Sequence, residues 1–124
     1  MSGERVVFFN LFRIRFPVTA IVSIGHRISG VALALFIPVL VCLLQRSLAS
    51  AERFEDAVAL FRHTAVRVIV VLLVWALAHH VLAGVRHLSF DIHVGTHLGA
   101  ARASAWAVFA LELAVVLITI GAMS

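Results

Sequence analysis

Charge, lysine and cysteine are all scarce in this sequence. Charged residues make up 13% of its 124 residues, and all ten basic residues are arginine. The single cysteine, Cys42, excludes an intrachain disulfide and a cysteine set for iron–sulphur clusters, and we expect its thiol to be buried and inert. The sequence also lacks a glycine-rich phosphate loop, a dinucleotide-binding fingerprint and internal repeats. It therefore predicts a single domain, residues 1–124, without a flavin or nucleotide fold.

Hydrophobic residues take the place of the missing charge. They make up 63% of the sequence, and the mean hydropathy of +1.11 exceeds what the core of a soluble domain needs. Three stretches of the chain, residues 28–45, 68–85 and 103–124, lack formal charge apart from Glu112 in the last. Each is close to the roughly 20 residues that cross a bilayer as a helix, which predicts an all-α membrane protein. The expected transmembrane helices cover about residues 18–48, 65–90 and 103–123.

The ten arginines bracket the hydrophobic stretches, where interfacial anchors belong. This distribution argues against nucleic-acid binding despite the net charge of +4. Three crossings place the two termini on opposite sides, and an inside N-terminus gives a modest excess of inner arginines, so we predict a cytoplasmic N-terminus. The inner set is Arg5, Arg13, Arg15, Arg27, Arg86 and Arg102, and the outer set is Arg46, Arg53, Arg62 and Arg67. Residues 1–16 lack an apolar core followed by a cleavage site, so we expect no signal peptide there.

Helical signals also lie outside the apolar stretches. Pro17 fits the start of the first helix, where a missing amide proton costs nothing. Between the first two spans, Phe54, Val58 and Phe61 recur at helical spacing, and acidic residues precede Arg62 as the helix dipole favours. We predict a short amphipathic helix there, lying along the outer membrane surface.

A stripe of small residues with one arginine follows one face of the first span. Ser23, Arg27, Gly30 and Ala34 are separated by four, three and four residues, which places them on a common helix face. Small residues allow close approach of another helix or a flat ligand, and the arginine supplies positive charge and several donors. The alternative is that Arg27 only extends to the lipid headgroups.

A line of polar residues follows one face of the second span. His80, Gly84, His87 and Asp91 share it, whereas His79 points about 100° away and cannot share its role. A neutral imidazole at His80 is a natural axial ligand for haem iron, and Gly84 one turn on leaves room for a porphyrin edge. A lone histidine is more often a packing residue, but its neighbours on this line favour a cofactor.

Glu112 is the one acidic residue inside an apolar stretch. A carboxylate facing lipid would cost several kcal/mol, so we expect it to face the bundle, protonated or hydrogen-bonded. In an antiparallel pair of helices Trp75 and His79 fall at a similar depth, and they are the nearest candidate donors in this chain. A residue of a partner subunit is the alternative.

Two stretches carry a resemblance to a known family. Residues 15–30 read RFPVTAIVSIGHRISG, and residues 80–91 read HVLAGVRHLSFD. They resemble the two signature stretches of the cytochrome b membrane-anchor subunit of succinate dehydrogenase, respiratory complex II. The number, length and order of the hydrophobic spans are similar as well. The resemblance implies a three-helix bundle that a partner anchor subunit completes.

The resemblance also implies roles for individual residues. His80 would be one axial ligand of haem b, with the other supplied by the second anchor subunit. Ser23 and Arg27 would line the quinone pocket, and His26 and Arg27 would approach the haem propionates. His87 and Asp91 lie at the inner end of their helix, where water could relay protons to the quinone. An interfacial salt bridge between Asp91 and an arginine is the bland alternative for that end.

The function that follows is electron transfer from succinate oxidation to ubiquinone in the respiratory chain and citric acid cycle. The chain has no catalytic residues for succinate itself, so the implied partners are a flavoprotein subunit, an iron–sulphur subunit and a second anchor subunit. The expected location is the inner (cytoplasmic) membrane of a bacterium. Two alternatives remain: the anchor of a fumarate reductase, and a membrane transporter subunit that binds an anionic solute.

Overall fold

Four helices make up the fold in the computed structural model, which describes residues 16–124. They are α1 (Val18–Ser47), α2 (Ala51–Leu60), α3 (Thr64–Asp91) and α4 (Leu98–Ala122). Helices α1, α3 and α4 are long and apolar enough to cross a membrane, and the described part of the chain contains no strand, so the prediction of an all-α protein with three spans is confirmed. Our expectations for the N-terminal stretch, including the signal peptide and the inner-side Arg5, Arg13 and Arg15, lie outside the described residues.

The helix ends follow from local chemistry. Pro17 is the N-cap of α1, as expected, and its carbonyl accepts the amide of Ala20 at 2.9 Å. Helix α4 begins at Leu98 rather than at residue 103. The prediction follows the uncharged stretch, which starts after Arg102, but a helix can include an arginine in its first turns. The prediction places the start of the helix at the first residue after the last arginine, which is too late by five residues.

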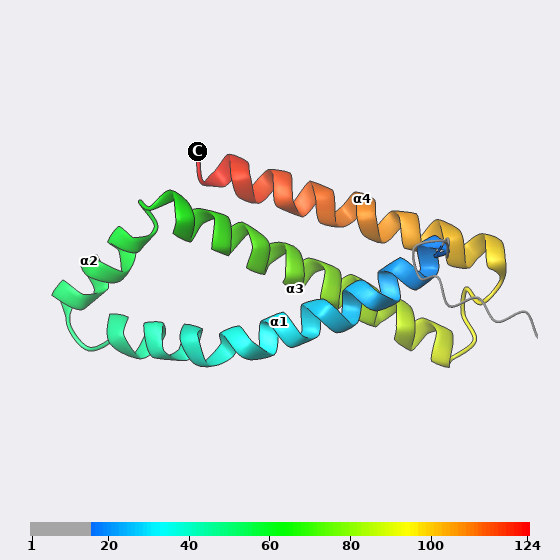
Figure 1. Cartoon of the computed structure of the whole chain (residues 1–124), viewed down its shortest axis with the longest axis horizontal. Coiled ribbons are helices and arrows are strands. Elements are labelled where there is room, and N and C mark those ends of the chain that lie inside the picture. The colour runs from blue at the N-terminus through cyan, green and yellow to red at the C-terminus, as the bar shows by residue number, and fades with distance from the viewer. Residues whose placement is uncertain (1–15) are drawn as a thin grey trace, which may run out of the picture.

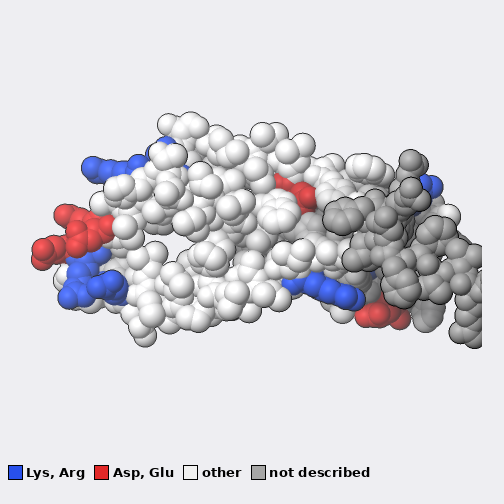
Figure 2. All heavy atoms as spheres, viewed as in Figure 1, with Lys and Arg blue, Asp and Glu red and all other residues white. Residues whose placement is uncertain are grey.

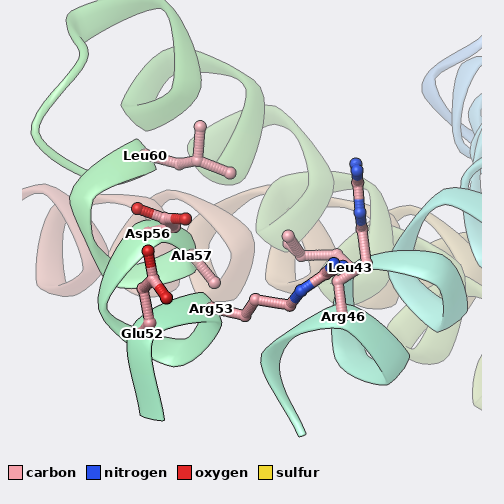
Figure 3. A pocket seen from close by; sticks show the side chains of 7 residues that line it. All are labelled: Leu43, Arg46, Glu52, Arg53, Asp56, Ala57 and Leu60. Atoms are coloured by element: carbon pink, nitrogen blue, oxygen red, sulfur yellow. The ribbon is translucent and has the colours of Figure 1, made fainter. Parts of the chain in front are cut away.

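Helix α2 is the amphipathic segment that the sequence predicts. The hydroxyl of Ser50 caps it by accepting the amide of Arg53 at 3.2 Å. Phe54, Val58 and Phe61 remain exposed, as a helix lying on a membrane surface requires. Between α2 and the end of α1 is a hollow with a mixed charged and apolar lining (Figure 3). Its lining residues are Leu43, Arg46, Glu52, Arg53, Asp56, Ala57 and Leu60.

The long helices converge at one end of the molecule and separate at the other. Figure 1 shows α1 crossing α3 near the N-terminal part of α1, while α4 runs beside α3. Toward α2 the helices α1 and α3 diverge, which leaves an apolar hollow between them lined by side chains such as Phe36, Leu72 and Trp75. The convergent end therefore brings residues of three helices together.

The buried core is small, and most large apolar side chains face outward. Val22, Ala83, Ala105 and Val108 form the core cluster where α1, α3 and α4 meet. Figure 2 shows charged side chains gathered mainly toward the two ends of a long apolar body, as expected for a protein surrounded by lipid and other subunits. Cys42 is exposed on this chain, so the expectation of a thiol buried within it is wrong.

Candidate functional site

Three histidines gather where α1 crosses α3. The ring of His26 stacks on that of His80, with centroids 4.3 Å apart and 12° between the planes, and lies 5.1 Å from the ring of His87. Gly84 permits this approach, since a Cβ atom there would lie 3.3 Å from His26 Nε2. The predicted line of His80, Gly84 and His87 therefore faces His26 on α1.

One ring nitrogen of His80 is held by α1. Its Nδ1 lies 3.2 Å from the backbone oxygen of His26 and 3.4 Å from Ser29 Oγ. A carbonyl oxygen only accepts, so Nδ1 carries the proton and donates it, which leaves a lone pair on Nε2. Gly30 makes room for the ring, because a Cβ atom there would lie 2.9 Å from His80 Cε1. Such a histidine, with one nitrogen donating to a carbonyl and the other free, is typical of a metal ligand.

His79, the adjacent residue, is in the opposite situation. Its side chain is 2% exposed, and both ring nitrogens are engaged. Nδ1 lies 2.6 Å from Glu112 Oε2 on α4, and Nε2 lies 3.2 Å from the backbone oxygen of Val22 on α1. A Cβ atom at Gly25 would lie 2.5 Å from Nε2, so glycine is the residue that fits beneath this ring. His79 thus links three helices and retains no free lone pair.

The expectation for Glu112 is confirmed. The residue is 6% exposed, faces the bundle, and has as its partner His79, one of the two candidates that the sequence provides. Trp75, the other candidate, lies against the His79 ring with centroids 5.7 Å apart. The 2.6 Å separation is short for a hydrogen bond between a nitrogen and an oxygen.

Arg86 differs from the interfacial anchor that the sequence suggests. It is 6% exposed and donates to α4, with Nε 3.0 Å from Ser104 Oγ and Nη2 3.1 Å from the backbone oxygen of Ala101. Its guanidinium group also lies 4.5 Å from the centroid of the Phe90 ring. Arg86 is thus held between α3 and α4, because α4 supplies acceptors within its reach.

The stripe on α1 is divided between two environments. Gly30 packs against His80, whereas Arg27 and Ala34 are exposed and Ser23 is half-buried. Within residues 16–124, Arg27 makes no ion pair or hydrogen bond. Its guanidinium group is therefore available to a ligand, a lipid or another subunit at the surface of this chain.

His87 and Asp91 occupy the end of α3. His87 is half-buried beside His26, while Asp91 is the last residue of the helix and is exposed. Among the described arginines none forms an ion pair with Asp91, so the alternative of a salt bridge has no partner in that part of the chain.

Several residues of this region escaped the sequence reasoning. They are Gly25, Ser29, Ser104 and the carbonyl of Val22. Ser29 and Gly30 belong to the signature stretch, which is a signal that could have been followed, since a buried serine needs a partner. The other three depend on the register at which helices cross, which local spacing does not give.

The clustered histidines do not form a complete metal site within the described part of the chain. Residues 16–124 contain no group of three or more His, Cys, Asp or Glu side chains arranged to hold a metal ion. The three clustered histidines are stacked and tilted against one another rather than pointed at a common centre. Of the three, His80 has one ring nitrogen at hydrogen-bond distance from a backbone carbonyl and the other without a hydrogen-bond partner in the described chain.

Comparison with known proteins identifies the family of this chain. The family described as Succinate dehydrogenase/Fumarate reductase transmembrane subunit matches residues 1–119. The succinate dehydrogenase cytochrome b556 subunit of Coxiella burnetii is 39% identical over 119 residues, covering 94% of this chain and 95% of that protein. The subunit of the same name from Paracoccus denitrificans is 32% identical over 118 residues, covering 95% and 91%. The chain therefore belongs to the succinate dehydrogenase/fumarate reductase transmembrane subunit family, as a cytochrome b anchor of complex II.

Proposed function

We propose that this chain binds haem b and quinone in a succinate dehydrogenase and helps to pass electrons from succinate oxidation to ubiquinone. The names of both relatives favour succinate oxidation over the fumarate reductase alternative. A flavoprotein subunit and an iron–sulphur subunit would carry the earlier steps, and a second anchor subunit would complete the bundle. The assembly would lie in the inner (cytoplasmic) membrane of a bacterium, with the N-terminus of this chain in the cytoplasm and residues 1–124 forming one domain.

The contrast between His79 and His80 carries the proposal. Both imidazoles lie inside the membrane, but only His80 keeps a ring nitrogen available, because His79 uses one for Glu112 and the other for Val22. Haem iron accepts the lone pair of a neutral imidazole, and the Nδ1 hydrogen bond of His80 fixes the tautomer that presents it. His80 would therefore be the axial ligand from this chain.

The residues around His80 fit the rest of a haem. Gly30 and Gly84 remove side chains next to the histidine rings. Within the described chain the His26 ring nitrogens have no hydrogen-bond partner, so His26 and the exposed Arg27 can serve the anionic propionates. When bound, haem b supplies a one-electron carrier beside the quinone, and these residues would hold and orient it.

Ser23 and Arg27 would form this chain's part of the quinone pocket. The serine hydroxyl can donate to a quinone carbonyl, and the guanidinium group can stabilise negative charge that develops on reduction. Both lie on the part of α1 that crosses α3, one turn apart. Arg27 is exposed and Ser23 is half-buried, so both would be accessible to a ligand between subunits.

His87 and Asp91 would relay protons, since reducing a quinone to a quinol consumes two. Asp91 is exposed at the end of α3 and His87 lies one turn inside it, so together they lead from water toward His26. We expect His87→Ala and Asp91→Asn to slow quinone reduction most at high pH, where protons are scarce. A pH profile that matches the unmodified complex in both variants would remove the relay.

The experiment that tests the proposal compares His80→Leu with His79→Leu in the assembled complex. We expect His80→Leu to lose the low-spin haem b spectrum, because its iron ligand is gone, whereas His79→Leu retains axial ligation with lower thermal stability. Reduced-minus-oxidised spectra report the axial ligation, the pyridine haemochrome assay gives the haem content, and thermal unfolding gives the stability. Normal ligation in His80→Leu with loss in His79→Leu would reverse the assignment, and a pure complex without haem b would contradict it entirely.

A further inference from the structure

Helix α3 carries two adjacent histidines, and each has a side chain that can ligate haem iron. His79 and His80 are both imidazoles at nearly the same membrane depth, and they differ by about 100° of helix rotation. A rotation of α3 by about that angle around its axis would put the His79 side chain in the place of the His80 side chain. Something in the fold must therefore decide which histidine is presented.

The side chain of His79 is held by contacts with both neighbouring helices. Helix α4 holds Nδ1 through Glu112 at 2.6 Å, and α1 holds Nε2 through the Val22 carbonyl at 3.2 Å. The Val22 oxygen can only accept, so Nε2 carries a proton, and Nδ1 shares another with the carboxyl group. No lone pair is left for iron in either arrangement of that shared proton.

Packing against neighbouring side chains also restricts the orientation of the His79 ring. The Trp75 ring lies 5.7 Å and the Phe109 ring 6.3 Å from it, and Gly25 faces Nε2 so closely that a methyl group would collide. The partners of His79 come from both neighbouring helices, so rotation of α3 in either direction would break buried hydrogen bonds. Glu112 has no other hydrogen-bond partner in the described chain.

We infer that Glu112 is a positioning residue for the haem: acting through His79, it withholds that histidine from the iron and fixes the rotation of α3 so that His80 alone is presented. Neither Glu112 nor His79 touches the cofactor in this arrangement. The inference rests on the proposed haem ligation by His80. That ligation alone does not explain why a carboxyl group is buried at Glu112, whereas the positioning role does.

Substitution at Glu112 tests the inference in the purified complex. Glu112→Leu releases Nδ1 of His79, so the ferric haem should develop a second low-spin component in low-temperature electron paramagnetic resonance, rising to about 10% or more of the signal. Glu112→Gln keeps the shape and a hydrogen-bonding group, so it should retain the single component and the wild-type redox potential. A Glu112→Leu complex with one wild-type signal and potential would overturn the inference.

A double substitution separates ligand choice from general loosening. Adding His79→Phe to Glu112→Leu removes the competing ligand, so the second component should disappear while the lower thermal stability remains. If the second component persists without His79, the heterogeneity comes from elsewhere and the inference is wrong.

A variant on α1 covers the case in which Glu112→Leu fails to assemble. Gly25→Ala pushes the His79 ring from the opposite side and should produce the same second component. Gly121→Ala is the matched control, because a Cβ atom there meets nothing within 4 Å, and it should leave the spectrum unchanged. Identical spectra for Gly25→Ala and Gly121→Ala would overturn the inference.

The outcomes distinguish this inference from the proposal on which it rests. Loss of haem in His80→Leu together with an unchanged Glu112→Leu spectrum would contradict the positioning role alone. Full axial ligation in His80→Leu would contradict the proposed ligand, whatever Glu112 does.

Discussion

The two ends of the molecule hold their helices in different ways. At the locked end, where α1, α3 and α4 share the contacts of His26, His79, Arg86 and Glu112, helices meet through hydrogen bonds, stacked rings and glycines. At the α2 end, residues 43–60, α1 and α3 have separated and the side chains are mostly exposed (Figure 1). Lipid is as apolar as the helix surfaces, so the hydrophobic effect contributes little to helix association in a membrane. Small residues and polar contacts therefore determine where the helices pack. The candidate site lies at the end that these contacts hold rigid.

The largest effect on stability should come from breaking the α3–α4 contact of the locked end. Arg86→Met removes two hydrogen bonds from a buried charged donor, and we expect the free energy of unfolding to fall by about 2–4 kcal/mol. Thermal unfolding of the complex in detergent measures it. Ser104→Ala should reproduce about 1 kcal/mol of that loss, and a double-mutant cycle gives the coupling between them. Strictly additive losses would show that this contact does not hold the two helices.

The next effect should appear in quinone chemistry. Arg27→Ala should lower quinone reduction by about 100-fold and Ser23→Ala by less, since each removes a donor aimed at developing negative charge. Succinate oxidation with a soluble artificial acceptor should persist in both variants. Arg46→Ala, an exposed arginine at the α2 end, is the control and should leave quinone kinetics unchanged. Equal behaviour of all three variants would remove the distinction between the two ends.

A smaller effect is expected at the glycine that faces His80. Gly30→Ala places a methyl group 2.9 Å from His80 Cε1, so the ring must move and the haem content per complex should fall, by about tenfold at equilibrium. Gly99→Ala, where a Cβ atom meets nothing within 4 Å, is the matched control. Haem content can be measured against a flavin assay of the same sample. Full haem loading in Gly30→Ala would mean that His80 has more freedom than its contacts suggest.

The smallest effect belongs to the α2 end. Ser50→Ala removes the cap of α2, which should lower stability by about 1 kcal/mol or less without changing haem content or quinone reduction. Circular dichroism during thermal unfolding and the two functional assays measure this. A loss of haem in Ser50→Ala would show that the two ends are coupled.

The sequence predicts the elements of this fold better than their contacts. Apolar length gives the three spans and amphipathic spacing gives α2, because both properties depend on residues close together in the chain. The pairing of Glu112 with His79 could also be anticipated, since membrane depth follows from counting residues along antiparallel helices. The transporter alternative loses its support, because the chain belongs to a family of respiratory anchors.

The crossing of α1 and α3 could not be derived from spacing. Whether Gly25 faces His79 or Gly30 faces His80 depends on crossing angle and register, which many residues set together. The small-residue stripe predicts close approach of another helix or a flat ligand, and Gly30 does lie against α3, but spacing alone does not say that His80 is the residue it meets. The contacts of Arg86 depend on register in the same way, since its acceptors lie on another helix.

The contact between His79 and Glu112 also bears on how the chain enters the membrane. A carboxyl group near the centre of a helix adds about 2.5–3.5 kcal/mol to its insertion free energy on translocon scales. Helix α3 is synthesised before α4, so a hydrogen-bonding partner already waits in the bilayer when Glu112 arrives. We therefore expect α4 to insert against the α3 helix that is already in the bilayer, and glycosylation mapping should find α4 inserting less efficiently when α3 is replaced by an apolar helix without histidine.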